Sequence, residues 1–221
     1  MAAIISGKLV KLGPSQNAMG GTELLAERLL KGTNKELFEN TNIVFNRPDL
    51  YEQYLVNSRN IFNFQDLPND RMYINFFKSE MVNRFSHFVF NSDYQKEAFC
   101  NKFDFNGRNI SVIKNSIFPI EMKQKKYDGK VNLIYHTTPH RGLELLAHCF
   151  PKILDENDNV YLKIFSSLKI YGWDEKDKVF EPLYKKLKNT KNVEYSSNVS
   201  NEEIRTNLIN SYIFAYPNIW H

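Results

Sequence analysis

Short apolar runs alternate with amphipathic helical patterns along almost the whole chain of 221 residues. Four runs in the first half are rich in β-branched or aromatic residues, as buried parallel strands are. They cover residues 43–45, 60–64, 88–90 and 111–113. This alternation predicts an α/β protein in which helices cover both faces of a parallel sheet.

Two of the helices in this first half have recognisable starts. Ser92 lies three residues before Gln95, which is the spacing of a capping box, and the helix that it opens is expected to reach about Phe103. Thr22 or a neighbour is expected to cap an earlier helix.

The same alternation begins again after a polar, charged stretch at residues 123–130. Further strands are predicted at residues 131–135, 160–165, 193–195 and 212–216. The helix after the first of these strands has apolar residues at i, i+3, i+4 and i+7, namely Leu143, Leu146, Ala147 and Phe150. Ser200 and Glu203 form a second capping box.

The chain is therefore expected to hold two α/β domains, residues 1–124 and residues 125–221. An open, doubly wound domain usually continues beyond a fourth strand. The second domain is accordingly expected to be incomplete.

Composition and charge exclude several classes of protein. A net charge of +4 without a stripe of Lys, Arg and aromatic residues argues against a nucleic-acid partner. No run reaches the roughly 18 apolar residues of a membrane span, and the N-terminus lacks a signal peptide, so a cytoplasmic protein is expected. Peripheral membrane contact stays open. Cys100 and Cys149 have no metal-ligand neighbours at useful spacing and are expected to be buried, reduced thiols.

The first candidate binding segment is the loop at residues 13–23, in which Gly20 and Gly21 lead into a helix. Glycines let a backbone approach a ligand closely, and free N–H groups at a helix start attract phosphate or carboxylate. The spacing is not that of the dinucleotide fingerprint G-x-G-x-x-G. A turn with no ligand remains the alternative.

The second candidate is the segment from Thr137 to Gly142, which again connects a strand to a helix. The guanidinium of Arg141 beside a helix N-terminus is suited to clamp a pyrophosphate. Ligands of open α/β sheets gather at the carboxyl ends of strands, which is where this segment is expected. A surface arginine without a ligand is the alternative.

The third candidate is the pair Gln65 and Asp66, which follows a predicted strand of the first domain. Taken singly, Asp66 and the nearby Asp70 are typical turn formers. Motifs of serine hydrolases, zinc peptidases, redox dithiols and P-loop proteins are absent from the sequence, as is the D-x-D carboxylate pair. No metal and no cofactor is expected.

Read in order, these segments resemble the family-four glycosyltransferases, which are retaining enzymes of the GT-B fold with two Rossmann-like domains. The resemblance rests on the glycine loop, a strand–Ser–helix element, a V-I-x-N segment, an R-G motif and a final Tyr-Pro pair. These stand at residues 20–23, 88–95, 112–117, 141–146 and 216–217.

The sequence departs from the family pattern at several positions. Gln65 and Asp66 stand where many members have His-Asp, and His136 stands where an Arg is usual. Ser116 and the pair at residues 166–167 replace glycines. The E-x7-E carboxylates of the family would lie beyond the last residue.

The resemblance implies transfer of a sugar from a nucleotide-sugar donor to a glycan or other hydroxyl acceptor, with retention of configuration. It assigns Gln65 and Asp66 to catalysis and Thr22 and Glu23 to the acceptor. It assigns the donor to Gly20, Gly21, Asn115, His136, Thr137, Arg141, Gly142 and Ser166. In this scheme Arg141 and the glycine loop neutralise charge on the leaving nucleoside diphosphate.

Two alternatives share this architecture. A sugar-nucleotide epimerase has the same fold and needs no acceptor. An inactive fragment or homologue would bind a nucleotide or sugar without transferring it. The presence of both E-x7-E glutamates in a longer sequence would favour the transferase.

Overall fold

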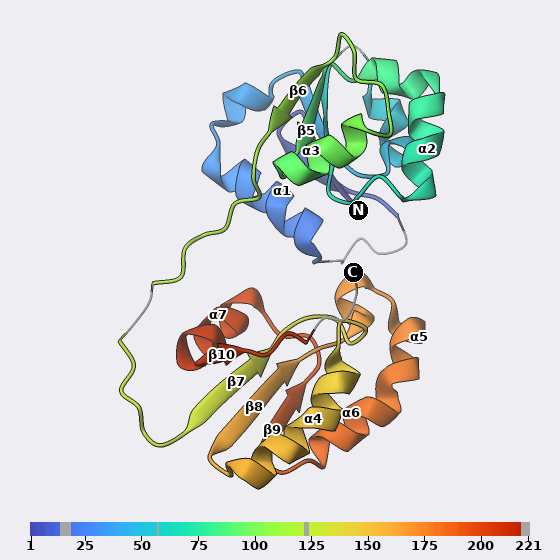
Figure 1. The fold of residues 1–221 in the computed structure, drawn as a ribbon. Helices are drawn as coiled ribbons and strands as arrows, with labels where there is room; N and C mark the ends of the chain where they lie inside the picture. The colour runs from blue at the N-terminus through green and yellow to red at the C-terminus, as the bar shows by residue number, and fades with distance from the viewer. Residues whose placement is uncertain (14–18, 57, 122–123, 218–221) are drawn as a thin grey trace. The chain divides into compact units, whose positions relative to one another are not determined.

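The computed structural model describes residues 1–13, 19–56, 58–121 and 124–217 of the chain (Figure 1). The chain divides into two compact units, Met1–Phe118 and Pro119–His221. The division falls slightly before the domain boundary expected between residues 124 and 125.

The first unit contains a six-stranded sheet with the order β2-β1-β3-β4-β5-β6. Its strands are β1 (Ala2–Ile5), β2 (Lys8–Lys11), β3 (Thr41–Phe45), β4 (Arg59–Asn63), β5 (His87–Phe90) and β6 (Asn109–Val112). The strands from β3 to β6 pair in parallel, as predicted.

The hairpin of β1 and β2 was not predicted from the sequence. β1 pairs antiparallel with both β2 and β3, so β2 runs in the same direction as the parallel strands. Ser6 and Gly7 connect the two strands, with φ of 45° and 77°. Two successive residues with positive φ match the right-handed twist of a tight hairpin.

Helices cover both faces of this sheet, which confirms the expected layering. The helices are α1 (Gly21–Gly32), α2 (Arg71–Lys78) and α3 (Asp93–Cys100), with the 3₁₀ helices η1 (Lys35–Phe38), η2 (Pro48–Tyr54) and η3 (Glu80–Arg84). On one face, aromatic side chains of β4 and β5 pack against α2 and α3; the rings of Phe64 and Phe90 stack with centroids 4.8 Å apart. On the other face, Ile4 and Phe45 pack with Leu25 of α1. Burial of one such ring stabilises the fold by about 1.5–3 kcal/mol.

The two predicted helix starts of this unit differ in outcome. The Ser92 hydroxyl accepts a hydrogen bond from the Gln95 N–H at 3.1 Å, as predicted, although α3 ends before Phe103. The other prediction was wrong: α1 begins at Gly21, its N-cap is Gly20, and no side chain caps it. Thr22 therefore lies inside the first turn.

The second unit contains a parallel four-stranded sheet with the order β10-β7-β8-β9. Its strands are β7 (Val131–Tyr135), β8 (Val160–Phe165), β9 (Val193–Ser196) and β10 (Ile213–Phe214). Its helices are α4 (Leu143–Glu156), α5 (Asp174–Asp177), α6 (Glu181–Lys188) and α7 (Asn201–Asn210), with the 3₁₀ helices η4 (Leu168–Tyr171) and η5 (Lys178–Phe180). β7 and β8 have the predicted bounds, whereas β10 is shorter than predicted.

The predicted apolar face of α4 is confirmed. Leu143, Leu146, Ala147 and Phe150 are all buried, and they pack with residues of the sheet and of α6. Figure 1 shows α4 and α6 beside one another on one face of this sheet. The hydroxyl of Ser200 accepts from the Glu203 N–H at 3.1 Å, which confirms the second cap.

The prediction of two buried cysteines was wrong. Both thiols are free, but Cys100 is exposed at the end of α3 and Cys149 is half-buried on α4. An amphipathic helical pattern places a residue on a helix, but a cysteine near the edge of the apolar face remains in contact with water.

Candidate functional site

The strand order of the second unit indicates at which edge of its sheet a ligand would be expected. β7 is the first strand of the unit, β8 and β9 follow on one side of it, and β10 lies on the other side. The order therefore reverses between β7 and β10. Open α/β sheets bind ligands in the crevice at the carboxyl ends of the two strands where this reversal occurs.

Gly142 lies where the loop after β7 contacts the segment after β10. Its φ is 90°, in the left-handed region that glycine tolerates, and it is the N-cap of α4. A Cβ atom at this position would lie 2.0 Å from the carbonyl oxygen of Pro217. Only glycine allows the start of α4 to approach the segment after β10 so closely.

Aromatic rings connect the same two loops. The ring of His136 stacks on Phe214 at 4.6 Å, and Phe214 stacks on Tyr216 at 5.4 Å. The exposed Arg141 donates from Nη1 to the Tyr216 hydroxyl at 3.4 Å. Three residues predicted to bind the donor, His136, Arg141 and Gly142, thus contact the same segment of chain.

Burial lowers the pKa of His136 below its ordinary value. Burial and the charge of Arg141 lower the pKa of His140 as well. Both imidazoles therefore favour the neutral form near pH 7. Unlike the two imidazoles, Arg141 stays positively charged near pH 7. It lies next to the start of a 14-residue helix that no side chain caps.

The loop after β8 is held by a buried carboxylate. Asp177 accepts hydrogen bonds from the Ser167 hydroxyl at 2.8 Å, the Leu168 N–H at 2.6 Å and the Tyr184 hydroxyl at 2.7 Å. Ser166, which precedes Ser167 in this loop, is 2% exposed, and its hydroxyl has no hydrogen-bond partner within the described part of the chain. Nothing in the sequence indicates that Asp177 is buried, because it lies in a run of charged residues that is typical of a protein surface.

Thr137 is half-buried between His136 and Thr138. The structure assigns no ligand contact to Thr137 or to Ser166, whose roles stay predictions.

In the first unit, Gln65 and Asp66 lie at the carboxyl end of β4, as predicted. Asn46, directly after β3, contacts both of them. Its amide donates from Nδ2 to Asp66 Oδ2 at 2.5 Å, and its Oδ1 accepts from the Gln65 N–H at 3.2 Å. The side chain of Gln95 donates to the Asp66 carbonyl at 2.9 Å.

The electrostatic surroundings of Asp66 are uneven. The residue as a whole is exposed, but its carboxyl lies against Asn46 and near Asp70. Loss of water around the carboxyl raises the pKa of Asp66, the charge of Asp70 adds to this effect, and Asn46 and Arg47 oppose it. Asn46 was not predicted from the sequence. Its position directly after a strand could have indicated it, because Asn tolerates the left-handed backbone conformation found in turns.

The glycine loop is described only in part, because residues 14–18 lie outside the described residues. Gly20 is buried and Gly21 is exposed at the start of α1. The carboxylate of Glu23, predicted to bind an acceptor, is buried and lies 3.0 Å from the amino group of Met1.

Asn115 is exposed on the segment after β6. The neighbouring Ser116 carbonyl accepts from Nη1 of Arg28 at 3.0 Å, which attaches this segment to α1. The contacts of Asn115 itself identify no ligand.

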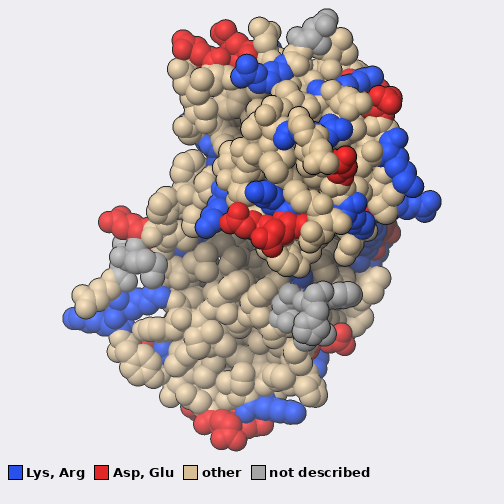
Figure 2. Space-filling model, turned by 45° about the horizontal axis from the view of Figure 1, so that its top comes forward, with Lys and Arg blue, Asp and Glu red and all other residues tan. Residues whose placement is uncertain are grey.

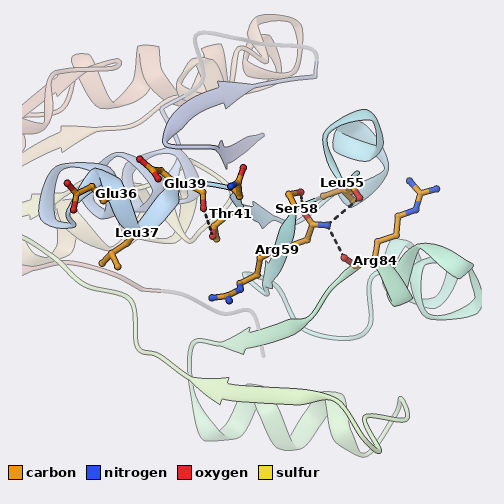
Figure 3. A pocket seen from close by; sticks show the side chains of 10 residues that line it. Glu36, Leu37, Glu39, Thr41, Leu55, Ser58, Arg59 and Arg84 are labelled. Atoms are coloured by element: carbon orange, nitrogen blue, oxygen red, sulfur yellow. Dashed lines mark hydrogen bonds between the residues drawn. The ribbon is translucent and has the colours of Figure 1, made fainter.

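A hollow of about 750 Å³ lies at the opposite, amino-terminal edge of the first sheet (Figure 3). It is lined by Glu36, Leu37, Glu39, Asn40, Thr41, Leu55, Ser58, Arg59, Asn60 and Arg84. The buried Asn60 donates to the carbonyls of Leu55 and Arg84, so these contacts brace the local backbone. None of the residues predicted to bind or react lines this hollow.

The surface adds little to the choice of ligand. On the face shown in Figure 2, Lys and Arg side chains are interspersed with Asp and Glu. No helix of the described chain is both long and apolar enough to cross a membrane. Within residues 1–13, 19–56, 58–121 and 124–217, no group of three or more His, Cys, Asp or Glu is arranged to hold a metal ion.

No known protein-family profile matches the sequence, and no curated protein matches it either. Solved structures share its fold. The pneumococcal O-GlcNAc transferase GtfA, in complex with UDP and GlcNAc, is 11% identical, with a TM-score of 0.50, over 82% of this chain and 38% of its own.

Two further solved structures have TM-scores of 0.49. TarM is 16% identical over 81% of this chain and 37% of its own. An α,α-trehalose-phosphate synthase (UDP-forming) from Burkholderia vietnamiensis is 14% identical over 76% of this chain and 47% of its own. This chain spans less than half the length of each of these three proteins.

The likeness to GtfA concerns the fold. The α/β architecture with two Rossmann-like units is that of the GT-B glycosyltransferases.

Proposed function

We propose that this chain belongs to a glycosyltransferase that moves a sugar from a nucleotide-sugar donor to a hydroxyl acceptor. The observation that carries the proposal is the edge of the second sheet between β7 and β10. There Arg141 and the uncapped start of α4 lie where open α/β sheets bind nucleotides.

The donor diphosphate is suited to this edge for electrostatic reasons. The Leu143 N–H already donates to the Pro139 carbonyl at 3.3 Å, so the donors that a ligand could use are the N–H groups that follow it in the first turn of α4, where the helix dipole favours a negative charge. Arg141 is exposed and adds two or more N–H donors. Together they would stabilise the charge that builds on the leaving nucleoside diphosphate.

The first unit supplies polar groups for the acceptor in this proposal. Gln65 and Asp66 lie together at the carboxyl end of β4, and Asn46 binds the Gln65 N–H and the Asp66 carboxyl. We assign the acceptor hydroxyl to this edge. We also propose retention of configuration and no metal ion, which rest on the resemblance to family-four glycosyltransferases.

An NMR-monitored titration of the chain with UDP and UDP-GlcNAc tests the proposal. Binding at the proposed edge would shift the amide signals of the loop after β7 and of the first turn of α4. Shifts confined to the hollow at the amino-terminal edge of the first sheet would contradict it. Addition of a hydroxyl acceptor and detection of the anomeric signal of the product then test transfer and retention.

A nucleotide-binding protein without transfer is the second candidate, and one observation favours it. The side chain of Glu23, which the family resemblance assigns to the acceptor, is buried and so presents little surface to an acceptor. Binding of UDP without release of sugar to any acceptor or to water would support this candidate.

A further inference from the structure

Asn46 has a backbone conformation that its surroundings must maintain. It lies directly after β3 with φ of 54°, and Arg47 follows with φ of 48°. Two successive left-handed residues other than glycine are unfavourable, although Asn tolerates this region better than most residues. Non-glycine residues in such conformations cluster at functional sites, where the surrounding contacts hold them.

All the hydrogen-bonding groups of the Asn46 side chain point to neighbouring residues. Its Oδ1 accepts from the Tyr73 hydroxyl at 2.6 Å and from the Gln65 N–H, and its Nδ2 donates to Asp66. Asn46 is 5% exposed and its bond to Tyr73 is buried, whereas its bonds to Gln65 and Asp66 are partly exposed to water. One amide therefore connects the ends of β3 and β4 with α2.

Asp66 is held at two points and open at a third. Asn46 binds its Oδ2, and Gln95 of α3 binds its main-chain carbonyl. Its Oδ1 has no partner within the described ranges of the chain, and the residue is exposed. This leaves one carboxylate oxygen, in a fixed orientation, free to accept a hydrogen bond.

We propose that Asn46 is a positioning residue that orients the carboxylate of Asp66 toward an acceptor hydroxyl at this edge. The inference rests on the proposed function, in which Asp66 contacts the acceptor. Asn46 itself touches neither donor nor acceptor. It acts by fixing one oxygen of Asp66 so that the other is presented to the ligand.

The charged groups around Asp66 determine what a change at Asn46 would do. Asp70 lies nearby as a second carboxylate, Arg47 as a cation and Tyr73 as a phenol whose pKa is raised mainly by burial. Asn46→Asp keeps an oxygen for Tyr73 and Gln65 but replaces the amide donor with another carboxyl. The pKa of Asp66 should then rise further, because a favourable bond becomes a like-charge contact.

Asn42, near the start of β3, is a matched control. Like Asn46 it is a buried asparagine, 1% exposed, but it lies within the strand and toward the amino-terminal edge of the sheet. Its Nδ2 donates to the Tyr54 carbonyl, the Ser58 hydroxyl and Asn60 Oδ1. Asn42→Asp should disturb a buried network of similar size without touching Asp66.

The experiment measures the full chain and both variants in three ways. The titration midpoint of the Asp66 carboxyl is followed by ¹³C NMR, UDP affinity by calorimetry, and sugar transfer from UDP-GlcNAc by product formation. Asn46→Asp should move the midpoint to higher pH and lower kcat about tenfold or more with donor KM unchanged. Asn42→Asp should leave the midpoint in place, whatever its effect on thermal stability.

A midpoint that does not move in Asn46→Asp, or a kcat loss equal to that of Asn42→Asp, would overturn the inference. If Asn46→Asp does not fold, the double variant Asn46→Ala with Tyr73→Phe removes the amide together with the hydroxyl that would lose its partner. It should raise the midpoint and lower kcat in the same way, and an unchanged midpoint would overturn the inference. If the wild-type chain transfers no sugar, the proposed function fails, and the carboxyl titration alone decides whether Asn46 orients Asp66.

Discussion

The two sheets hold their carboxyl-end loops by different physical means. In the first unit, side-chain amides connect the loops: Asn46 binds Asp66 and Gln65, and Gln95 binds the main-chain carbonyl of Asp66. In the second unit, close packing connects them: Gly142 lies against the Pro217 carbonyl, and His136 stacks on Phe214. Hydrogen bonds fix the orientation of individual groups, whereas close packing fixes the position of whole segments.

This difference separates two kinds of sensitivity. Changes at the amide-linked edge should alter the orientation and titration of single groups, since the core of aromatic rings beneath them is unaffected. Changes at the packed edge should alter the stability of the second unit as a whole, because interiors are not continuously deformable.

Gly142→Ala should have the largest effect. A methyl group would meet the Pro217 carbonyl oxygen, and alanine would also be strained at a φ of 90°. The two costs together are about 2–5 kcal/mol of the free energy of unfolding of the second unit. Chemical denaturation with a signal from each unit measures this.

Gly32 provides the control for that change. It lies at the end of α1, and a Cβ atom there would meet nothing within 4 Å. Gly32→Ala should be neutral or stabilise the first unit by up to about 1 kcal/mol. Equal effects of the two substitutions would contradict the packed edge.

Asp177→Asn should have a smaller effect, also on the second unit. The substitution removes the charge that accepts three hydrogen bonds, and its NH₂ group can donate to the hydroxyl of Ser167 or Tyr184 but cannot accept from the Leu168 N–H. The loss should be about 2–3 kcal/mol, with destabilisation of the loop after β8. Thermal unfolding measures the loss, and hydrogen exchange of the Leu168 N–H locates it.

Asp155 of α4 is an exposed carboxylate of the same unit and serves as the control. Asp155→Asn should change stability by less than about 0.5 kcal/mol. A loss in Asp177→Asn that is no larger than this would show that the buried carboxylate does not hold the loop.

The smallest expected effect is a pH dependence at the packed edge. Because burial lowers the pKa of His136, the folded state favours the neutral imidazole. Its contribution to stability is complete above the unfolded pKa of about 6.5 and is lost as pH falls through the lower pKa of the folded state. The second unit should therefore lose stability on mild acidification.

His136→Gln should remove part of this dependence, measured as the denaturation midpoint of the second unit between neutral and mildly acidic pH. His140, whose pKa is also lowered, should account for a further part. A wild-type midpoint that does not fall on acidification would contradict the neutral, stacked imidazole.

The sequence predicted the layered α/β fold because its signals were local. The apolar runs of β7 and β8, the spacing on α4 and the caps at Ser92 and Ser200 all act within a few residues. The β1–β2 hairpin was missed because half of β1 is alanine, which is depleted in strands, and its turn is a Ser-Gly pair, not the Asn-Gly or Asp-Gly of a typical hairpin. Tertiary pairing, not local pattern, defines those strands.

Residues of the candidate site could be predicted from the sequence only where they directly follow a predicted strand. Arg141 and Asp66 follow strands, so their position at the carboxyl ends was accessible from the sequence. Asn46 was not, because it acts through contacts to residues that are distant in the chain, and Asp177 was not, because it lies in a run of charged residues. Cys100, expected to be buried, is exposed, since helical periodicity does not tell where the apolar face ends.

The central claim is that the edge between β7 and β10 binds a nucleotide diphosphate through Arg141. Calorimetric titration of UDP and UDP-GlcNAc into the wild-type chain, Arg141→Ala and Arg59→Ala tests this binding most directly. Arg59 serves as the control because it is also an exposed arginine, but it lines the hollow of the other unit. The account predicts that Arg141→Ala weakens binding by about 1–3 kcal/mol, whereas Arg59→Ala binds as the wild type does. Equal affinity of Arg141→Ala and wild type, or no binding by the wild-type chain, would contradict it.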